Sequence, residues 1–260
     1  MATSDKLLSV LDLFDLERPD WSVEEAARAL ALPTSTAYRY VSSLTRCGLL
    51  APLGTARYIL GPTILRYDRQ LRLTDPLISA ARVEMDAVAK AHPGTVVFLC
   101  RLIGRQVMCV HQASVGEPSF ATSYERGRLM PLYAGSASKS ILAGLPSRQV
   151  RPMFEREPQA FAAAGMGDDW KSVKSRLRAI RAGGVVVTQG EIDAGMRGLS
   201  VVIADEARSI LASLSLVAPE ESLDASAVAA ASDALRRAAA KIGEILKSED
   251  SPLVTSEAAS

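Results

Sequence analysis

Seven polar side chains between positions 35 and 46 have the types and the spacing to act together on one partner. They are Ser35, Thr36, Tyr38, Arg39, Ser42, Ser43 and Arg46. Hydroxyl and guanidinium groups of this kind contact the phosphates and the base edges of duplex DNA. The chemistry that this set indicates is therefore DNA binding. A solvent-exposed helix of no special function would also carry a polar face, so the neighbouring elements must decide between the two interpretations.

The residues between these polar positions predict the helix that presents them. Apolar side chains recur at i, i+3, i+4 and i+7, which is the pattern of one buried helix face: Ala37, Tyr40, Val41 and Leu44. This helix covers about residues 34–47 and ends at Gly48. A shorter helix over residues 21–30 precedes it, and Ser22 and Glu25 have the spacing of a capping box. Two helices joined by so short a turn predict a helix-turn-helix, whose second helix enters the major groove.

A two-stranded wing is expected next, and its charge suits the same partner. Residues 49–51 and 57–60 predict two short strands around a turn at Gly54. From residue 35 to residue 72 the chain carries six arginines and one acid, although the net charge of the whole chain is only +1. Such a local positive field favours contact with phosphates. Ser22 on the first helix and Thr55 and Arg57 on the wing complete the predicted DNA-binding set.

A second candidate site lies near the middle of the chain, where small residues begin an expected helix. The segment Gly135-Ser136-Ala137-Ser138 would leave backbone amides accessible at the helix start. Those amides and the helix dipole attract an anion such as a carboxylate. The same residues could instead only cap their own helix, and the sequence leaves both interpretations open. Three arginines could pair with such an anion or form surface ion pairs: Arg126, Arg128 and Arg197.

Periodicity and turn residues predict the elements that hold both sites. Helices are expected over residues 4–16 and 64–73, and another starts at Thr74-Asp75-Pro76 and runs to about residue 91. Strands are expected over residues 95–102, 106–113, 120–123, 185–187, 199–204 and 210–218. Further helices are expected from residue 136 and over residues 147–155, 168–182 and 223–247. This order predicts an α+β domain built on an antiparallel sheet.

Two groups of residues resemble the signatures of one known family. The first comprises Ser22-Val23, Leu32-Pro33, Ser35-Thr36, Arg39, Leu44, Gly48-Leu49 and Arg57-Tyr58-x-Leu60-Gly61-Pro62. The second comprises Gly127-Arg128, Pro131-Leu132-Tyr133-Ala134-Gly135-Ser136-Ala137-Ser138-Lys139 and Glu191-x-x-x-Gly195-x-Arg197. Together, and in this order, they are similar to the IclR family of bacterial transcription regulators.

The resemblance implies an α+β fold divided into four parts. A winged helix-turn-helix DNA-binding domain would occupy residues 1–62, and a linker helix residues 63–75. An effector-binding and oligomerisation domain would occupy residues 76–247, with a GAF-like or profilin-like antiparallel sheet of about six strands and flanking helices. Residues 248–260 would form a frayed tail.

The resemblance also implies which residues contact the effector. They are Thr122, Met130, Ser136, Ala137, Thr188, Glu191, Met196, Gly198 and Ser215. The chain departs from the family pattern at five positions, where His, Gly, Pro, Cys and Ser are usual: Tyr133, Ser138, Ala194, Gly198 and Val217. These changes remove polar groups and add space. We therefore expect a larger or partly aromatic carboxylate rather than the smallest keto acid known for the family.

The partners implied by the resemblance are double-stranded operator DNA, a small organic-acid effector and further copies of the chain, as a homodimer or a tetramer. We expect no export signal or membrane segment. Three cysteines without CxxC spacing favour reduced thiols in a cytoplasm, and with two histidines we expect no metal and no cofactor. One alternative stays open, which is an effector-independent DNA-binding or architectural protein whose second domain only oligomerises.

One short enzyme motif is present in the sequence. Ser136 and Lys139 match the S-x-x-K of penicillin-recognising enzymes, but no K-T-G follows and the chain contains no asparagine. The sequence also contains no G-x-S-x-G, phosphate-binding P-loop, H-E-x-x-H or dinucleotide-binding fingerprint. We therefore expect that the protein is not an enzyme.

Overall fold

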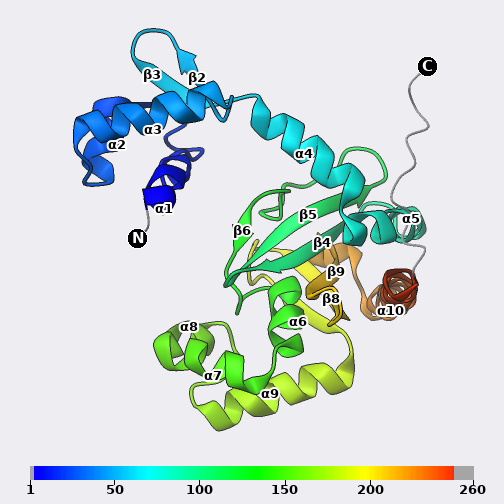
Figure 1. Cartoon of the computed structure of the whole chain (residues 1–260). Coiled ribbons are helices and arrows are strands. Elements are labelled where there is room, and N and C mark those ends of the chain that lie inside the picture. Colours follow the sequence, from blue (N-terminus) through cyan, green and yellow to red (C-terminus); the bar gives the residue numbers. More distant parts are fainter. Residues whose placement is uncertain (1–2, 249–260) are drawn as a thin grey trace, which may run out of the picture. The chain divides into compact units, whose positions relative to one another are not determined.

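The computed structural model describes residues 3–248, and internal contacts divide the chain after Leu73 into two compact units, each described here by itself. The elements of the first unit are α1 (Thr3–Leu8), the 3-10 turn η1 (Leu11–Leu13), β1 (Trp21–Ser22), α2 (Val23–Ala29), α3 (Thr34–Arg46), β2 (Leu50–Leu53), β3 (Arg57–Leu60) and α4 (Thr63–Thr74). Figure 1 labels all of these except η1 and β1. The strands form an antiparallel sheet in the order β1-β3-β2.

The core of the first unit forms where α2, α3 and the start of β2 meet. The four residues of the predicted apolar stripe are all buried on α3: Ala37, Tyr40, Val41 and Leu44. α3 ends where Gly48 adopts a φ of +69°, and the Thr63 hydroxyl donates a hydrogen bond to the Cys47 carbonyl at 3.0 Å. The structure confirms the helix-turn-helix and the wing.

The single N-terminal helix expected over residues 4–16 is wrong. α1 ends at Leu8, after which the Ser9 hydroxyl donates to the Lys6 carbonyl, and η1 follows as a separate turn. The indole nitrogen of Trp21 donates to the Leu13 carbonyl at 2.8 Å. This bond and the burial of Val10 fix two short pieces against the core, where the sequence pattern alone predicted one straight helix.

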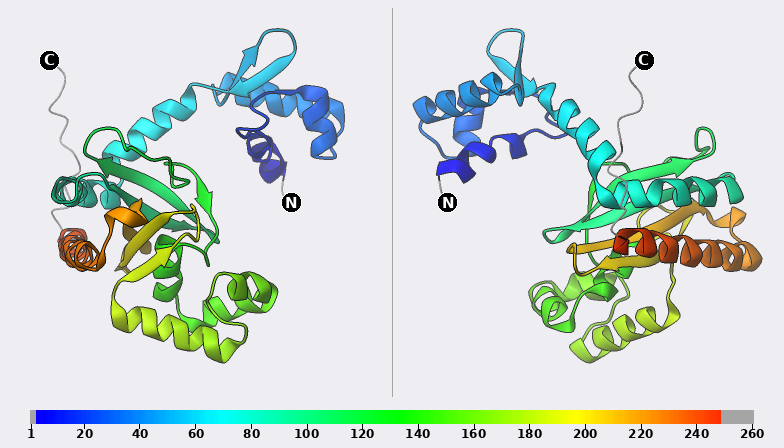
Figure 2. Two further views of the ribbon diagram at one scale, coloured as in Figure 1. Left: turned by 180° about the vertical axis from the view of Figure 1, so that it is seen from behind. Right: turned by 45° about the vertical axis from the view of Figure 1, so that its right-hand side comes forward.

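The second unit is an antiparallel sheet with helices on both faces. Its elements are α5 (Pro76–Ala91), β4 (Val96–Ile103), β5 (Gln106–Ser114), β6 (Leu129–Met130), α6 (Ser136–Gly144), α7 (Ser147–Arg156), α8 (Pro158–Ala163), α9 (Trp170–Gly183), β7 (Val186–Gln189), β8 (Met196–Asp205), β9 (Ile210–Pro219), the 3-10 turn η2 (Glu220–Ser222) and α10 (Ala225–Lys247). The strand order is β6-β5-β4-β9-β8-β7. Figure 2 shows α5 and α10 on one face of the sheet, and α6, with α7 to α9 beyond it, on the other.

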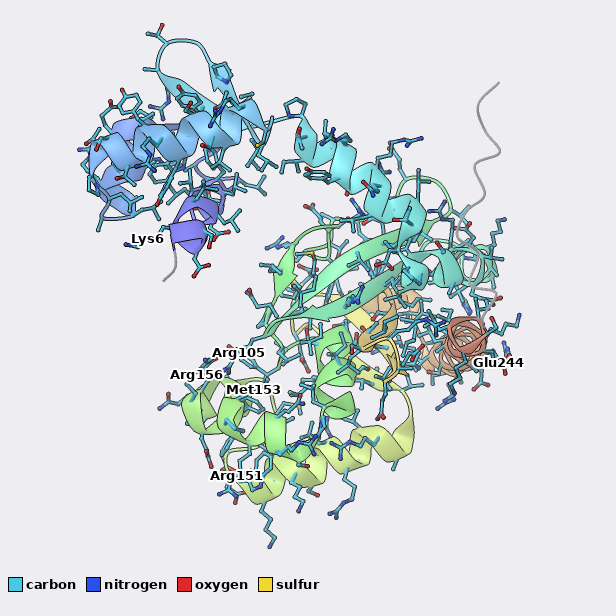
Figure 3. The ribbon with its side chains drawn as sticks, in the orientation of Figure 1. Lys6, Arg105, Arg151, Met153, Arg156 and Glu244 are labelled. Carbon is cyan, nitrogen blue, oxygen red and sulfur yellow. The ribbon has the colours of Figure 1, made fainter. Side chains whose placement is uncertain are left out.

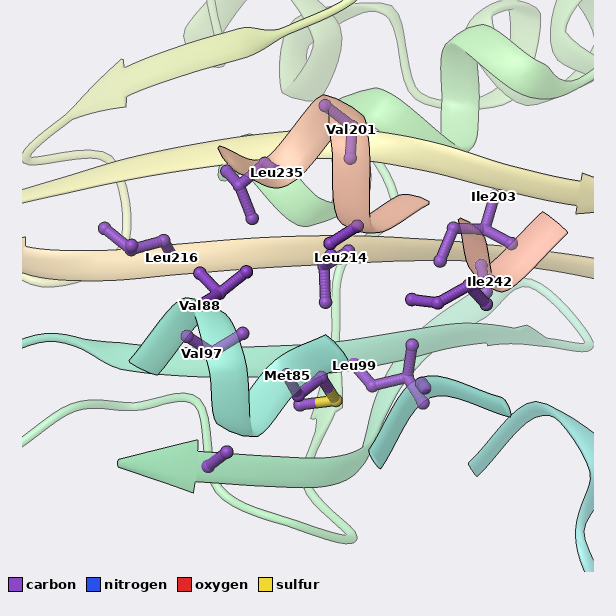
Figure 4. Close-up of a cluster of buried hydrophobic side chains, with 14 of the residues drawn as sticks. Met85, Val88, Val97, Leu99, Val201, Ile203, Leu214, Leu216, Leu235 and Ile242 are labelled. Carbon is purple, nitrogen blue, oxygen red and sulfur yellow. The ribbon is translucent and has the colours of Figure 1, made fainter. Parts of the chain in front are cut away.

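Alternation along the central strands builds a core on each face of this sheet. Figure 4 shows the core under α5 and α10, where Met85, Val88, Leu235 and Ile242 pack on Val97, Leu99, Val201, Ile203, Leu214 and Leu216. The intervening residues of β4 and β9, such as Phe98 and Val217, face the other core, beside α6. α6 lies over β8 and β9 on this face, and its first residue, Ser136, lies beside Gly198 of β8.

The strand expected over residues 120–123 is wrong. Those residues form an irregular loop, and the short edge strand is β6 instead. The reason is a set of bonds that replaces ladder pairing: the amide and the hydroxyl of Ser123 donate to the carboxylate of Asp193 at 2.8 and 2.6 Å. Two short elements, β1 and α8, are not predicted by the sequence pattern.

Two further expectations concern the cysteines and the membrane. Cys47, Cys100 and Cys109 are free thiols, of which the last two are buried. Within residues 3–248, none of the helices has the length and the apolar character needed to cross a membrane.

Candidate functional site

The first candidate site is the outward face of α3, which its buried stripe turns away from the core. Besides Tyr38, five of the predicted residues are exposed there and on the wing: Ser35, Arg39, Ser42, Arg46 and Thr55. Thr36 and Ser43 are half-buried, and Arg46 donates to the Ser43 hydroxyl at 3.1 Å. Within the described residues Arg39 has no ion-pair partner, so its guanidinium is available to an outside acceptor.

Three other predicted DNA-binding residues have partners inside the unit. Ser22 is the N-cap of α2 and forms both hydrogen bonds of a capping box with Glu25. The Tyr38 hydroxyl donates to Glu24 at 2.8 Å, and this bond raises the pKa of Tyr38. The Arg57 guanidinium forms an ion pair with Asp20, and its Nη1 lies 3.4 Å from Oε2 of Glu25. The hydrogen bond to Asp20 raises the pKa of Arg57. These side chains hold α2, α3 and β3 together, a role that the sequence analysis did not assign to Tyr38 or Arg57.

The second candidate site is a pocket in the second unit, between the start of α6, the loop that precedes β8, and the sheet. It encloses about 280 Å³ of empty space, its open mouth included. Its lining residues are Tyr124, Gly135, Ser136, Thr188, Glu191, Ile192, Asp193, Met196, Gly198 and Val217. Gly198 leaves room there, because a Cβ at this position would lie 2.7 Å from the Ser136 hydroxyl oxygen and 3.3 Å from that of Thr188.

The amide at the start of α6 is held by a carboxylate of the protein itself. Oε2 of Glu191 accepts a hydrogen bond from the backbone amide of Gly135 at 3.0 Å. Oε1 of the same carboxylate lies 2.6 Å from Nζ of Lys139, whose side chain is only 3 % exposed. Lys139 also donates to the Ala164 carbonyl at 2.6 Å. The charge of Glu191 is thus compensated before any ligand binds.

Asp193 attaches the irregular loop to the mouth of the pocket. Besides its two bonds from Ser123, it accepts one from the Thr122 hydroxyl at 3.3 Å. Tyr124, which follows Ser123 in the chain, is buried, and its ring centroid lies 5.5 Å from that of Phe98. Its hydroxyl has no hydrogen-bond partner among the described residues, and burial raises its pKa far above the usual range. The group is therefore a neutral phenol that can donate.

The predicted effector-binding residues divide into two groups. Five of them line the pocket: Ser136, Thr188, Glu191, Met196 and Gly198. The Thr122 hydroxyl donates to Asp193, and Ala137 is buried within α6. Met130 of β6 packs in the core, and the Ser215 hydroxyl donates to the Ser200 hydroxyl at 2.9 Å. These four do not line the pocket.

Three further residues line the pocket that the sequence did not predict there: Tyr124, Ile192 and Asp193. Asp193 falls inside the Glu191-x-x-x-Gly195 signature, which was the available signal for it and for Ile192. Tyr124 belongs to no motif, and only the three-dimensional fold brings it to the helix start.

The arginines near this domain do not line the pocket. Arg197 donates to the Leu223 carbonyl and to the Gln189 side chain, and Arg126 donates to the Val110 carbonyl. Figure 3 labels Arg105, Met153 and Arg156, which line a separate shallow hollow with Tyr133 and Glu157. In the described part of the chain no cluster of three or more His, Cys, Asp or Glu could hold a metal ion.

Comparison with known proteins gives one consistent result. Residues 73–244 match a family model described as "Bacterial transcriptional regulator IclR C-terminal", and residues 3–54 match "IclR helix-turn-helix domain". The HTH-type transcriptional regulator KipR of Bacillus subtilis (strain 168) is 24 % identical over 220 residues, which cover 81 % of this chain and 83 % of KipR.

Two solved structures have the same fold at low sequence identity. The IclR transcriptional regulator of Alicyclobacillus acidocaldarius superposes with a TM-score of 0.78 at 22 % identity, covering 93 % of this chain and 97 % of that one. An IclR homolog of Microbacterium hydrocarbonoxydans, complexed with 4-hydroxybenzoate, superposes with a TM-score of 0.71 at 22 % identity, covering 94 % and 99 %. Both confirm the architecture of the two units.

Proposed function

The chain belongs to the IclR family of bacterial transcriptional regulators, and on that premise we propose that a small organic acid, bound in the pocket of the second unit, modulates binding of the first unit to operator DNA. The protein is a transcriptional regulator with a DNA-binding domain and an effector-binding domain. Because this family consists of regulators, the S-x-x-K match at Ser136 and Lys139 is not a catalytic site. The proposal assigns the action to the cytoplasm, where the DNA is.

The DNA-binding half of the proposal rests on α3. Its exposed face offers Ser35, Arg39, Ser42 and Arg46 to a groove, while its opposite face is fixed in the core. We assign residues 1–62 to this domain, 63–75 to the linker helix, and 76–247 to the effector-binding and oligomerisation domain. A helix-turn-helix of this kind reads a half-site, so a two-fold dimer would read a palindrome.

The effector half rests on one observation, the pocket between α6 and the loop before β8. Its floor and walls combine hydroxyls with the apolar side chains of Ile192, Met196 and Val217, as small-molecule sites commonly do. The 4-hydroxybenzoate bound by the Microbacterium homolog is a carboxylate with an aromatic body, and it supports the choice of a partly aromatic acid here.

Self-association is part of the proposal. α4 exposes an apolar stripe at i, i+3 and i+7, formed by Ile64, Tyr67 and Leu71, and Leu65 is 72 % exposed on another part of the helix surface. A surface of this kind marks an interaction site more often than a free one. We therefore propose that α4 contributes to a homodimer, which could pair again into a tetramer. The effector can alter DNA binding only by its different affinities for two arrangements of such an assembly.

Fluorescence anisotropy on the DNA upstream of the protein's own gene tests the proposal. The titration is run over a salt series, with and without a panel of small acids. Tight, sequence-dependent binding that one acid changes is the expected result. Tight binding that no acid changes would favour the effector-independent regulator. Weak binding without sequence preference would contradict the DNA-binding role of α3.

A further inference from the structure

We propose that Tyr124 is an effector-binding residue that donates its phenolic hydrogen to an acceptor oxygen of the ligand, and that the pocket therefore selects a monocarboxylic acid with an apolar body. This inference rests on the proposed function and adds to it the ligand's charge and a specific contact. Tyr124 lies outside the family signatures and outside the residues that they place in the pocket.

The Tyr124 hydroxyl is buried and forms no hydrogen bond with the described residues. The side chain is 5 % exposed, and the oxygen has no hydrogen-bond partner within residues 3–248. A buried hydroxyl without a partner is unfavourable, and native structures rarely retain one without a reason. Because Tyr124 lines the pocket, a ligand oxygen is the partner that the geometry provides for.

Tyr124 is held in position before a ligand binds. Asp193 accepts three hydrogen bonds from Thr122 and Ser123, the two residues that precede Tyr124. On its other side the ring packs on Phe98. Gly135 lets the hydroxyl approach the start of α6, since a Cβ at Gly135 would overlap the Tyr124 oxygen. Asp193 is thus a positioning residue, and little ordering remains for the ligand to impose.

The charged groups around the Tyr124 hydroxyl limit the charge that a ligand can carry. Two carboxylates line the pocket, those of Glu191 and Asp193, and within the described chain no arginine lines it. Lys139 compensates Glu191, and the donors from Thr122 and Ser123 occupy Asp193. A second ligand carboxylate would therefore meet like charge without a cation. One carboxylate can be accepted at the Tyr124 hydroxyl, where the neutral phenol is a donor.

The other lining residues of the pocket can contact the rest of the ligand. The Ser136 and Thr188 hydroxyl oxygens converge on the space beside Gly198, and they can donate to or accept from a polar group. Ile192, Met196 and Val217 offer apolar surface to a compact body. The chemistry on all sides fits a small monocarboxylate such as a substituted benzoate better than a dicarboxylate.

The test compares Tyr124→Phe with the wild type in the full-length protein. Isothermal titration with benzoate, 4-hydroxybenzoate and the dicarboxylate terephthalate measures affinity, and a thermal melt without ligand measures stability. Tyr133→Phe is the matched control, because it makes the same chemical change at a tyrosine that lies outside the pocket and packs on Phe161. We expect wild type to bind at least one monocarboxylate more tightly than terephthalate.

The expected result for Tyr124→Phe is a loss of monocarboxylate affinity of about tenfold or more, as removal of a hydrogen bond to a charged group produces. The ligand-free melting temperature should stay the same or rise, since no bond is broken. Tyr133→Phe should keep wild-type affinity. Equal affinity of wild type and Tyr124→Phe, or a lower ligand-free melting temperature for Tyr124→Phe alone, would overturn the role of Tyr124. Failure of wild type to bind any acid would overturn the proposed function and this inference together.

Discussion

The backbone amide of Gly135 donates its hydrogen to the Glu191 carboxylate at 3.0 Å, so an acid of the protein itself occupies the start of α6. The sequence leaves open whether this helix start attracts a ligand carboxylate or only caps its own helix. Glu191 and its buried partner Lys139 instead link α6 to the loop before β8, and this link shapes the wall of the pocket. On the proposed function, a ligand acid would bind beside Glu191 rather than in its place, with the Tyr124 hydroxyl as its donor.

Glu191→Gln should destabilise the second unit. The amide can still accept from Gly135, but Lys139 would keep a buried charge without its counter-ion. Removing one partner of such a pair costs about 3 kcal/mol, at the low end of the usual range because the Glu191 side chain is 28 % exposed. Denaturant unfolding followed by the fluorescence of Trp170, in a Trp21→Phe background, reports on this unit alone.

The control for that measurement is Glu221→Gln, which neutralises an exposed acid in the same unit. We expect no change beyond about 0.5 kcal/mol, as is usual for a surface substitution. Equal unfolding free energies for Glu191→Gln and Glu221→Gln would mean that the Lys139 pair contributes nothing to stability.

Gly198→Ala should block the effector pocket without preventing DNA binding. The added methyl would lie 2.7 Å from the Ser136 hydroxyl oxygen, which must rotate into the space that the ligand needs. We expect a fall in effector affinity of roughly tenfold or more, in line with the cost of overpacking a filled site. Gly243→Ala on α10 is the control, since nothing lies within 4 Å of its Cβ position. A Gly198→Ala protein that binds the acid as wild type does would show that the ligand lies elsewhere.

The sequence predicts the helix-turn-helix well because its signals are local. The stripe from Ala37 to Leu44 and the capping box of Ser22 and Glu25 each lie within a few residues, and both are present in the structure. The first helix was extended too far for the opposite reason. The bond from Trp21 to Leu13 joins segments that periodicity treats separately.

The pocket could be predicted only in part, because some of its lining residues reach it through long-range contacts. Ser136 and Glu191 stand in recognisable signatures and do line it. Tyr124 reaches it because Asp193, some 70 residues later in the chain, holds the preceding residue Ser123. No pattern within the loop gives that pairing, and the sequence predicts a strand over residues 120–123 instead. Ser215 lies on the same face of β9 as Val217, but its hydroxyl donates a hydrogen bond to the Ser200 hydroxyl.

Arg57→Ala should weaken the first unit rather than remove a phosphate contact. Its guanidinium joins β3 to Asp20 and Glu25, so its loss should lower the melting temperature of this unit. The slope of log affinity for DNA against log salt concentration should stay as in wild type. Arg46→Ala is the comparison, because Arg46 is exposed on α3 and a lost phosphate contact reduces that slope by about 1. A reduced slope for Arg57→Ala would show that Arg57 leaves Asp20 for the DNA.

Arg39→Ala should remove base recognition itself. The chain contains no asparagine and α3 no glutamine, so the usual bidentate contact to adenine is not available to this helix. Arg39 is exposed and has no ion-pair partner among the described residues, which leaves it able to form the bidentate contact to guanine. We expect the substitution to cost about 1–3 kcal/mol at the specific site and to relax the preference at one base pair. Anisotropy against operator variants changed one base pair at a time measures both effects. If Arg39→Ala instead weakens every variant equally and reduces the salt slope, Arg39 contacts a phosphate, and the sequence preference of α3 must come from the deformability of the DNA.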